Sequence, residues 1–157
     1  MSTPAQQLQS DLTRFPGLRP EEVLVLRAWL KLHESEFERF EYNVRVGPGQ
    51  DPGPTYTEDM RRMAILNSQK RIDAVGWKST QPWIIEVKQR AQSNAIGQLV
   101  SLDALWRNDK PFGNPPVMLL VANTLAPDVP ITLARYGIQL SLVPDVDFSI
   151  AAQIKGL

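Results

Sequence analysis

The sequence predicts a mixed α/β protein in which a central sheet is flanked by helices. Two apolar segments, 70–77 and 82–88, stand on either side of a short polar run, which is the pattern of a β-hairpin. Segments with apolar residues at helical spacing precede and follow this hairpin, at about 20–34 and 93–107. Helices and strands that follow one another in this way build a sheet with helices packed on it.

Length and composition predict one domain that spans residues 1–157. The 157 residues are 43% hydrophobic and 22% charged, which is ordinary for a globular protein with a sizeable core. We expect this core over about 20–143, after a polar lead-in at 1–18. No apolar segment approaches the length of a membrane span, and the start lacks the pattern of a secretory signal. The sequence therefore predicts a cytoplasmic protein, of a bacterial cell or a phage-infected host, that contacts no membrane.

The chain contains no cysteine. This composition excludes a disulfide framework, a thiolate metal site and a cysteine nucleophile.

One helix and one strand are predicted before the hairpin. Pro20 occupies a position that suits the first turn of the helix at 20–34. The segment 37–46 alternates between apolar and polar residues, which is the pattern of a strand. Four apolar residues of this segment are expected on one face of the strand: Phe40, Tyr42, Val44 and Val46.

The other elements are predicted from shorter patterns. The segment GPGQDPGP, residues 47–54, is a loop by composition, and Thr57 begins a short helix that ends near Asn67. After the helix at 93–107, the apolar run VMLLVAN predicts a central strand. A short helix near 130–136 and a last strand at 138–143 complete the fold.

Basic residues are concentrated in one part of the chain. The whole sequence carries 17 basic and 17 acidic residues, but residues 61–90 hold seven basic residues against two acidic ones. A local basic surface of this kind suits a polyanionic partner. A solvated basic face is the alternative interpretation of the same pattern.

The hairpin places its two acids opposite each other. A turn centred on Ser79 and Thr80 gives four pairs whose side chains lie on one face of the sheet. These pairs are Trp77 with Pro82, Val75 with Ile84, Asp73 with Glu86, and Arg71 with Lys88. A turn that is one residue longer or shorter would instead separate the two carboxylates onto opposite faces.

Two opposed carboxylates destabilise a sheet unless a proton or a cation lies between them. Oxygen ligands in the absence of cysteine favour Mg²⁺ or Mn²⁺ over Zn²⁺. Lys88 follows Glu86 on the same face, where it could assist an attacking water and offset developing charge. The arrangement suits phosphodiester hydrolysis. Ion pairs of the two acids with nearby Lys and Arg residues are the structural alternative.

The same residues resemble the PD-(D/E)XK nuclease superfamily over about residues 20–123. Asp73 and the triplet Glu86-Val87-Lys88 stand where that superfamily has its Asp and its (D/E)XK motif. Ile72 replaces the usual proline. The resemblance implies a restriction-endonuclease-like α-β-β-β-α-β core and a Mg²⁺- or Mn²⁺-dependent deoxyribonuclease. It further implies that Asp73, Glu86 and the Val87 carbonyl bind the metal and that Lys88 assists catalysis.

Two helices can add residues to this site. Similar nucleases often use an acid from the first helix, for which Glu22 is the first candidate and Glu21 the alternative. Both acids also fit the first turn of a helix for electrostatic reasons alone. Gln98 lies on the apolar face of the helix at 93–107, where similar nucleases place a glutamine or lysine in the site.

DNA is the expected partner, in duplex, single-stranded or branched form. Five basic residues near the acids are candidate phosphate contacts: Arg61, Arg62, Lys70, Arg71 and Arg90. A homodimer or another partner could supply the selectivity that a small core lacks. Two other hypotheses remain: a non-catalytic module that binds nucleic acid or protein, and a metal-free structural component of an assembly.

Overall fold

A five-stranded mixed sheet forms the centre of the computed structural model, which describes residues 1–155. The strands lie in the order in which they follow along the chain. They are β1 (Arg39–Val46), β2 (Lys70–Lys78), β3 (Gln81–Ala91), β4 (Val117–Leu125) and β5 (Gln139–Leu142). The pairs β1–β2 and β2–β3 are antiparallel, whereas β3–β4 and β4–β5 are parallel. The predicted mixed α/β architecture is confirmed.

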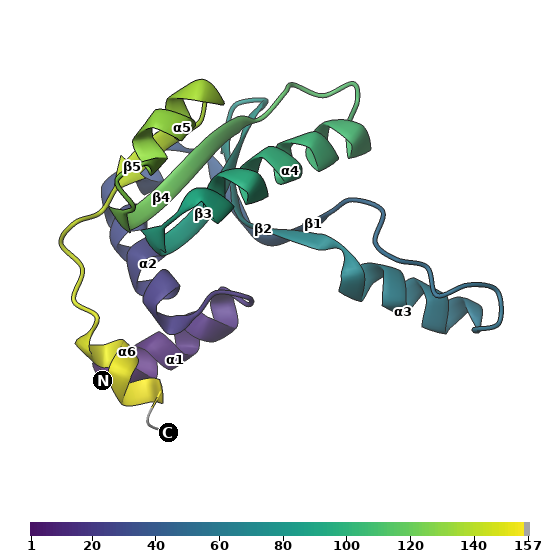
Figure 1. Ribbon diagram of the computed structural model, residues 1–157. Helices are drawn as coiled ribbons and strands as arrows, with labels where there is room; N and C mark the ends of the chain where they lie inside the picture. The colour runs from purple at the N-terminus through teal and green to yellow at the C-terminus, as the bar shows by residue number, and fades with distance from the viewer. Residues whose placement is uncertain (156–157) are drawn as a thin grey trace.

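Helices cover both faces of this sheet (Figure 1). They are α1 (Pro4–Arg14), α2 (Pro20–His33), the 3₁₀ turn η1 (Glu34–Glu36), α3 (Glu58–Ser68), α4 (Ser93–Asp109), α5 (Val129–Arg135) and α6 (Ser149–Lys155). Helix α2 packs on β3 and β4 from one side, and α4 packs on the same strands from the other. None of the helices in residues 1–155 is long and apolar enough to cross a membrane.

Two helices were not expected from the sequence. Residues 1–18 read as a polar lead-in, yet α1 begins there with a capping box between Thr3 and Gln6. It buries Leu8 and Phe15 follows it into the same core, which α6 also joins. The apolar face of α1 is narrow, because only a few of its positions contact the core. Most of its sequence is therefore polar and resembles a loop.

Strand β1 does not keep one face toward one core, as its alternation predicted. Phe40 and Tyr42 pack on the α2 side of the sheet, but Val44 and Val46 pack on the α4 side. Asn43 separates the two pairs and has a φ of 53°, a left-handed conformation that asparagine tolerates better than most residues. The backbone therefore rotates at Asn43, and the two ends of the strand present opposite faces.

The β1–β2 ribbon continues beyond this rotation and carries α3 away from the other helices (Figure 1). We call residues 47–69 the arm. Within it, the main-chain N–H of Gln50 donates to Ser68 Oγ at 2.6 Å, and Arg61 pairs with Asp51 at 2.6 Å. Helix α3 buries none of its residues, and its exposed apolar side chains include Met60 and Met63. Local hydrogen bonds, more than a core, hold the arm together.

Gly76 in β2 provides the first test of this packing. A Cβ at Gly76 would lie 2.6 Å from a ring carbon of Phe37, inside the aromatic cluster that Phe37 forms with Phe40 and Trp83. Because overpacking a filled core destabilises a protein by about 1–3 kcal/mol, Gly76→Ala should lower the free energy of unfolding by that amount. Urea denaturation measures the change. Gly113→Ala is the control, since its Cβ meets no atom closer than 3.7 Å and stability should stay within about 0.5 kcal/mol.

Candidate functional site

The hairpin of β2 and β3 has the predicted two-residue turn and register. Ser79 and Thr80 form the turn, and Ser79 has a φ of 56°. The pairs Trp77–Pro82 and Val75–Ile84 are confirmed. The ladder follows this register as far as Ala74 and Ile85.

The ladder ends just before the two acids, so the predicted pairs Asp73–Glu86 and Arg71–Lys88 are not formed as strand pairs. The cause is a side chain: the main-chain N–H of Val87 donates to Asp73 Oδ2 at 2.9 Å. A carboxylate that occupies the space between two strands replaces the direct backbone hydrogen bonds of the ladder. Beyond this point β2 pairs only with β1, and β3 pairs only with β4.

The two carboxyl groups nevertheless remain close to each other. Burial raises the pKa of Glu86 well above its ordinary value, and the negative charge of Asp73 raises it further. Burial also raises the pKa of Asp73, although the hydrogen bond from Val87 opposes this effect. The side chain of Glu86 hydrogen-bonds to Asp73. The pair therefore favours a shared proton over two negative charges at neutral pH.

Lys88 and Glu22 complete the electrostatic surroundings of the pair. Lys88 Nζ lies 3.4 Å from Glu86 Oε1, and its charge lowers the pKa of both acids. Glu22 is 6% exposed and raises both pKa values through its own charge. Glu22 Oε1 also accepts the main-chain N–H of Arg19 at 2.9 Å, which closes the start of α2. One residue therefore has a helix-capping contact and acts electrostatically on the pair.

Among residues 1–155, no three His, Asp or Glu side chains converge into a group that could hold a metal ion. The oxygen donors brought together by the hairpin are thus the carboxylates of Asp73 and Glu86. Of the two acids in the first turn of α2, Glu22 is the one whose negative charge raises the pKa of both Asp73 and Glu86.

A cavity of about 420 Å³ opens beside Glu86, between the start of β2 and α4. It is lined by Lys70, Arg71, Glu86, Asn94, Gly97, Gln98, Ser101 and Leu102. The structure thus brings Gln98 to the same cavity as Glu86, together with two of the five basic candidates. Asn94 and Ser101 were not expected. Their spacing places them with Gln98 along one helix face, but polar residues on a helix ordinarily indicate a solvated surface.

The other basic candidates lie outside this cavity. Arg61 and Arg62 belong to the arm, where they pair with Asp51 and Asp59. Arg90 is exposed near the end of β3, and its guanidinium donates to the Leu125 carbonyl at 3.4 Å.

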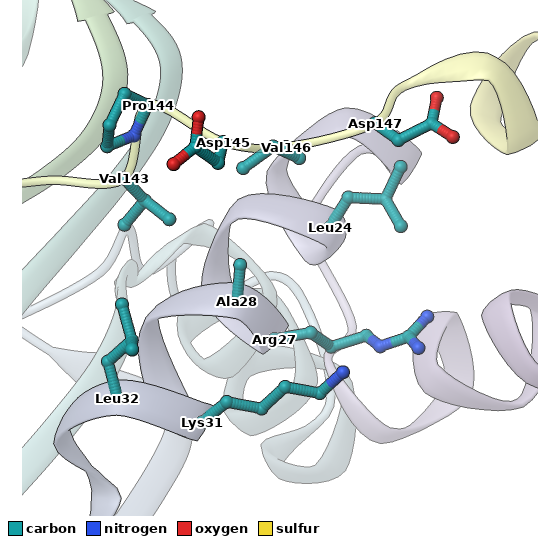
Figure 2. Close-up of a pocket in the computed structure, with 10 residues that line it drawn as sticks. All are labelled: Leu24, Arg27, Ala28, Lys31, Leu32, Val143, Pro144, Asp145, Val146 and Asp147. Atoms are coloured by element: carbon teal, nitrogen blue, oxygen red, sulfur yellow. The ribbon is translucent and has the colours of Figure 1, made fainter.

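A larger cavity of about 500 Å³ lies on the α2 side, between that helix and the segment 143–147 (Figure 2). Its wall is largely apolar, with Leu24, Ala28 and Val143 among the lining side chains. Four charged residues also line it, Arg27, Lys31, Asp145 and Asp147, and Arg27 pairs with Asp11 at 3.2 Å. The cavity lacks the buried acids, so the smaller one beside Glu86 is the candidate functional site.

Neither the known protein-family models nor the curated proteins include a match to this chain. Three solved structures are similar to it. A repair endonuclease from Pyrococcus abyssi matches with a TM-score of 0.50 and 15% identity, over 78% of this chain and 46% of its own. A complex of EndoMS with double-stranded DNA matches with a TM-score of 0.48 and 16% identity, over 81% and 46%. A protein of unknown function matches with a TM-score of 0.42 and 15% identity, over 85% and 67%.

The similarity to the repair endonuclease shows the fold of this chain. The five-stranded mixed sheet with flanking helices is the restriction-endonuclease-like fold. The chain spans 46% of the length of the repair endonuclease and of EndoMS. The sequence identity between this chain and these two proteins is only 15–16%, so the similarity is distant.

The raised pKa values of Asp73 and Glu86 predict a pH dependence of stability in EDTA. A carboxyl whose pKa is raised in the folded state keeps its proton after the unfolded chain, with a pKa near 4, has lost it. The free energy of unfolding should therefore fall as the pH rises from about 4 through neutrality. Glu86→Gln removes one charge and should flatten this fall, as urea denaturation at several pH values will show. At pH 8 the variant should be as stable as wild type or more stable.

Asp11→Asn is the matched control for Glu86→Gln. Asp11 is also buried, at 7% exposure, but it faces the cation Arg27. Removing its charge should destabilise the protein, because a buried ion pair loses one partner. A loss of stability in Glu86→Gln as large as that in Asp11→Asn would contradict the repulsion between Asp73 and Glu86.

Proposed function

We propose that the protein is a Mg²⁺- or Mn²⁺-dependent nuclease that hydrolyses phosphodiester bonds of DNA. The observation that carries the proposal is the pair of the partly buried Asp73 and the buried Glu86 where β2 and β3 separate, with Lys88 Nζ 3.4 Å from Glu86 Oε1. The restriction-endonuclease-like fold and the resemblance to the PD-(D/E)XK motif support the same chemistry, as does the structural similarity to a repair endonuclease. The preference for DNA comes from this resemblance.

The residues fit a hard divalent cation. The negative charge of Asp73 raises the pKa of the buried Glu86, so a cation can take the place of the proton that the pair would otherwise share. Carboxylate oxygens are the donors that Mg²⁺ and Mn²⁺ prefer. Asp73, Glu86 and the main-chain carbonyl of Val87 would hold the ion. When bound, a divalent cation supplies Lewis-acid stabilisation of the charge on a reacting phosphate.

Each neighbouring residue has a role in this proposal. Lys88, already next to Glu86, would orient the attacking water and stabilise negative charge that develops on the phosphate. Gln98 would contact the substrate from the cavity wall. Glu22 would hold the first turn of α2 in place and add negative charge near the metal, which strengthens the binding of a cation.

DNA would approach the acids through the cavity beside Glu86. Lys70 and Arg71 line it and provide positive charge for phosphate groups. We propose that Arg90 adds a phosphate contact at the exposed end of β3 and that Arg61 and Arg62 do so from the arm. The proposal also includes a homodimer, in which the second copy would contribute to selectivity for the DNA.

Lys88→Ala should reduce cleavage by several orders of magnitude, because the lysine acts on the water and on the developing charge. The assay uses circular single-stranded DNA and linear duplex DNA with Mg²⁺, Mn²⁺ or EDTA. The same variant should keep the rise in melting temperature that Mn²⁺ causes in the wild type, since lysine is no metal ligand. Bound ion stabilises by about 2.7 kcal/mol at a hundredfold excess over Kd.

Two results would count against this role. Wild-type cleavage by Lys88→Ala would remove the lysine from the chemistry. A wild-type protein that binds DNA but does not cleave it under any of these conditions would favour a non-catalytic binding module with the same fold.

Basic residues should differ in their contribution to the salt dependence of DNA affinity. Single alanine variants of Lys70 and Arg71 should each lower the slope of log affinity against log salt by about one, without changing sequence preference. Arg61→Ala and Arg62→Ala should have smaller effects, because both side chains are already paired with acids. Fluorescence anisotropy of DNA in the Lys88→Ala background, over a series of salt concentrations, measures the slopes. Unchanged slopes at all four positions would place the DNA elsewhere on the protein.

A further inference from the structure

Gly97 lies inside helix α4, four residues after its start, where glycine is an unusual residue. Glycine inside a helix is less favourable than alanine, because its backbone loses more conformational freedom on folding. No protein atom benefits from the missing side chain, since a Cβ at Gly97 would meet nothing within 4 Å. The residue is exposed and lies on the wall of the cavity beside Glu86. The open space above Gly97 therefore belongs to the cavity.

The other cavity residues define what could fill that space. Asn94, Gln98 and Ser101 lie on the same face of α4 as Gly97 and offer hydrogen-bonding groups. Lys70 and Arg71 contribute positive charge from β2, and Glu86 is a carboxyl group with 5% exposure. Leu102 is the one apolar side chain among the lining residues of this cavity.

We propose that this cavity seats the sugar and phosphate of one nucleotide next to the scissile bond, with the nucleic-acid backbone passing directly over Gly97. The inference rests on the proposed nuclease function and adds a positioning residue to it. A backbone that approaches this closely leaves no room for a side chain at position 97. The strand then lies against α4, with its phosphate between Lys70 and Arg71 and its reacting phosphate toward Glu86.

The lining favours the backbone of a nucleotide over its base. A site for a flipped or stacked base needs an aromatic side chain for its flat face, and none of the eight lining residues is aromatic. Amide, hydroxyl and cationic groups instead match the oxygens of sugar and phosphate. The contact consequently carries no sequence information, and the position of the strand depends on shape.

The experiment compares Gly97→Ala and Gly97→Val with the wild type in three measurements. The melting temperature of Gly97→Ala should rise by about 1–4 °C, because alanine suits an exposed helix position better than glycine. Cleavage at saturating DNA should fall by about tenfold in Gly97→Ala and about a hundredfold in Gly97→Val, as the strand is displaced from the acids. Affinity for a fluorescent single-stranded oligonucleotide in EDTA should fall in the same order.

Ala104 provides the matched control, because it is exposed on α4 but does not line the cavity. Ala104→Val introduces the same β-branched side chain and should leave cleavage and oligonucleotide affinity at wild-type values. Wild-type cleavage and affinity in Gly97→Val would overturn the inference while the nuclease function stands. If the wild type proves inactive, the proposed function fails, and oligonucleotide affinity still decides: equal affinity in wild type and Gly97→Val overturns the inference, whereas weaker affinity in Gly97→Val supports it.

Discussion

The hydrogen bond from the Val87 N–H to Asp73 Oδ2 is the contact on which the arrangement of the site depends. A backbone donor in the middle of a buried strand needs an acceptor, and a side-chain carboxylate provides it here in place of the neighbouring strand. The β2–β3 ladder consequently ends at Ala74 and Ile85. Both acids are thereby placed where the strands separate and where their charges are shielded by little water. Loss of this one acceptor would leave a buried N–H unsatisfied and would also remove a carboxylate from the pair.

The rotation at Asn43 has a related consequence on the next strand. Val44 and Ile72 face the α4 side, whereas Tyr42 and Ala74 face the α2 side, so β1 and β2 turn over together at the level of Asp73. The ribbon then leads out of the sheet into the arm (Figure 1). Its departure leaves the first residues of β2, Lys70 and Arg71, at the wall of the cavity below α4. The same two irregularities therefore separate the acids from the ladder and open a space beside them.

The sequence contains enough information for the sheet and hairpin but too little for these irregularities. The register could be predicted because the polar run between the two apolar segments is short, and the tightest turn it allows, at Ser79 and Thr80, is the one that forms. The bond between Asp73 and Val87 joins positions 14 residues apart, and no periodicity of either strand indicates it. Asn94 and Ser101 look like any solvated helix residues until the cavity beside them is known. Helix α1 is a different case: it was not expected, although Thr3 and Gln6 have the spacing of a capping box that marks the start of a helix.

Electrostatics connects the acids and the cavity. Glu22, Asp73 and Glu86 act on one another inside the protein, and a phosphate that enters the cavity beside Glu86 meets this negative charge at short range. Lys88, Lys70 and Arg71 oppose it, but their charges are spread over two strands. A divalent cation between Asp73 and Glu86 would remove the repulsion at its source and would therefore raise the affinity for a polyanion. Because such coupling is reciprocal, the polyanion must raise the affinity for the cation by the same factor. On the proposed function, metal and nucleic acid thus bind cooperatively, and the carboxylates stay protonated or paired with Lys88 until the cation binds.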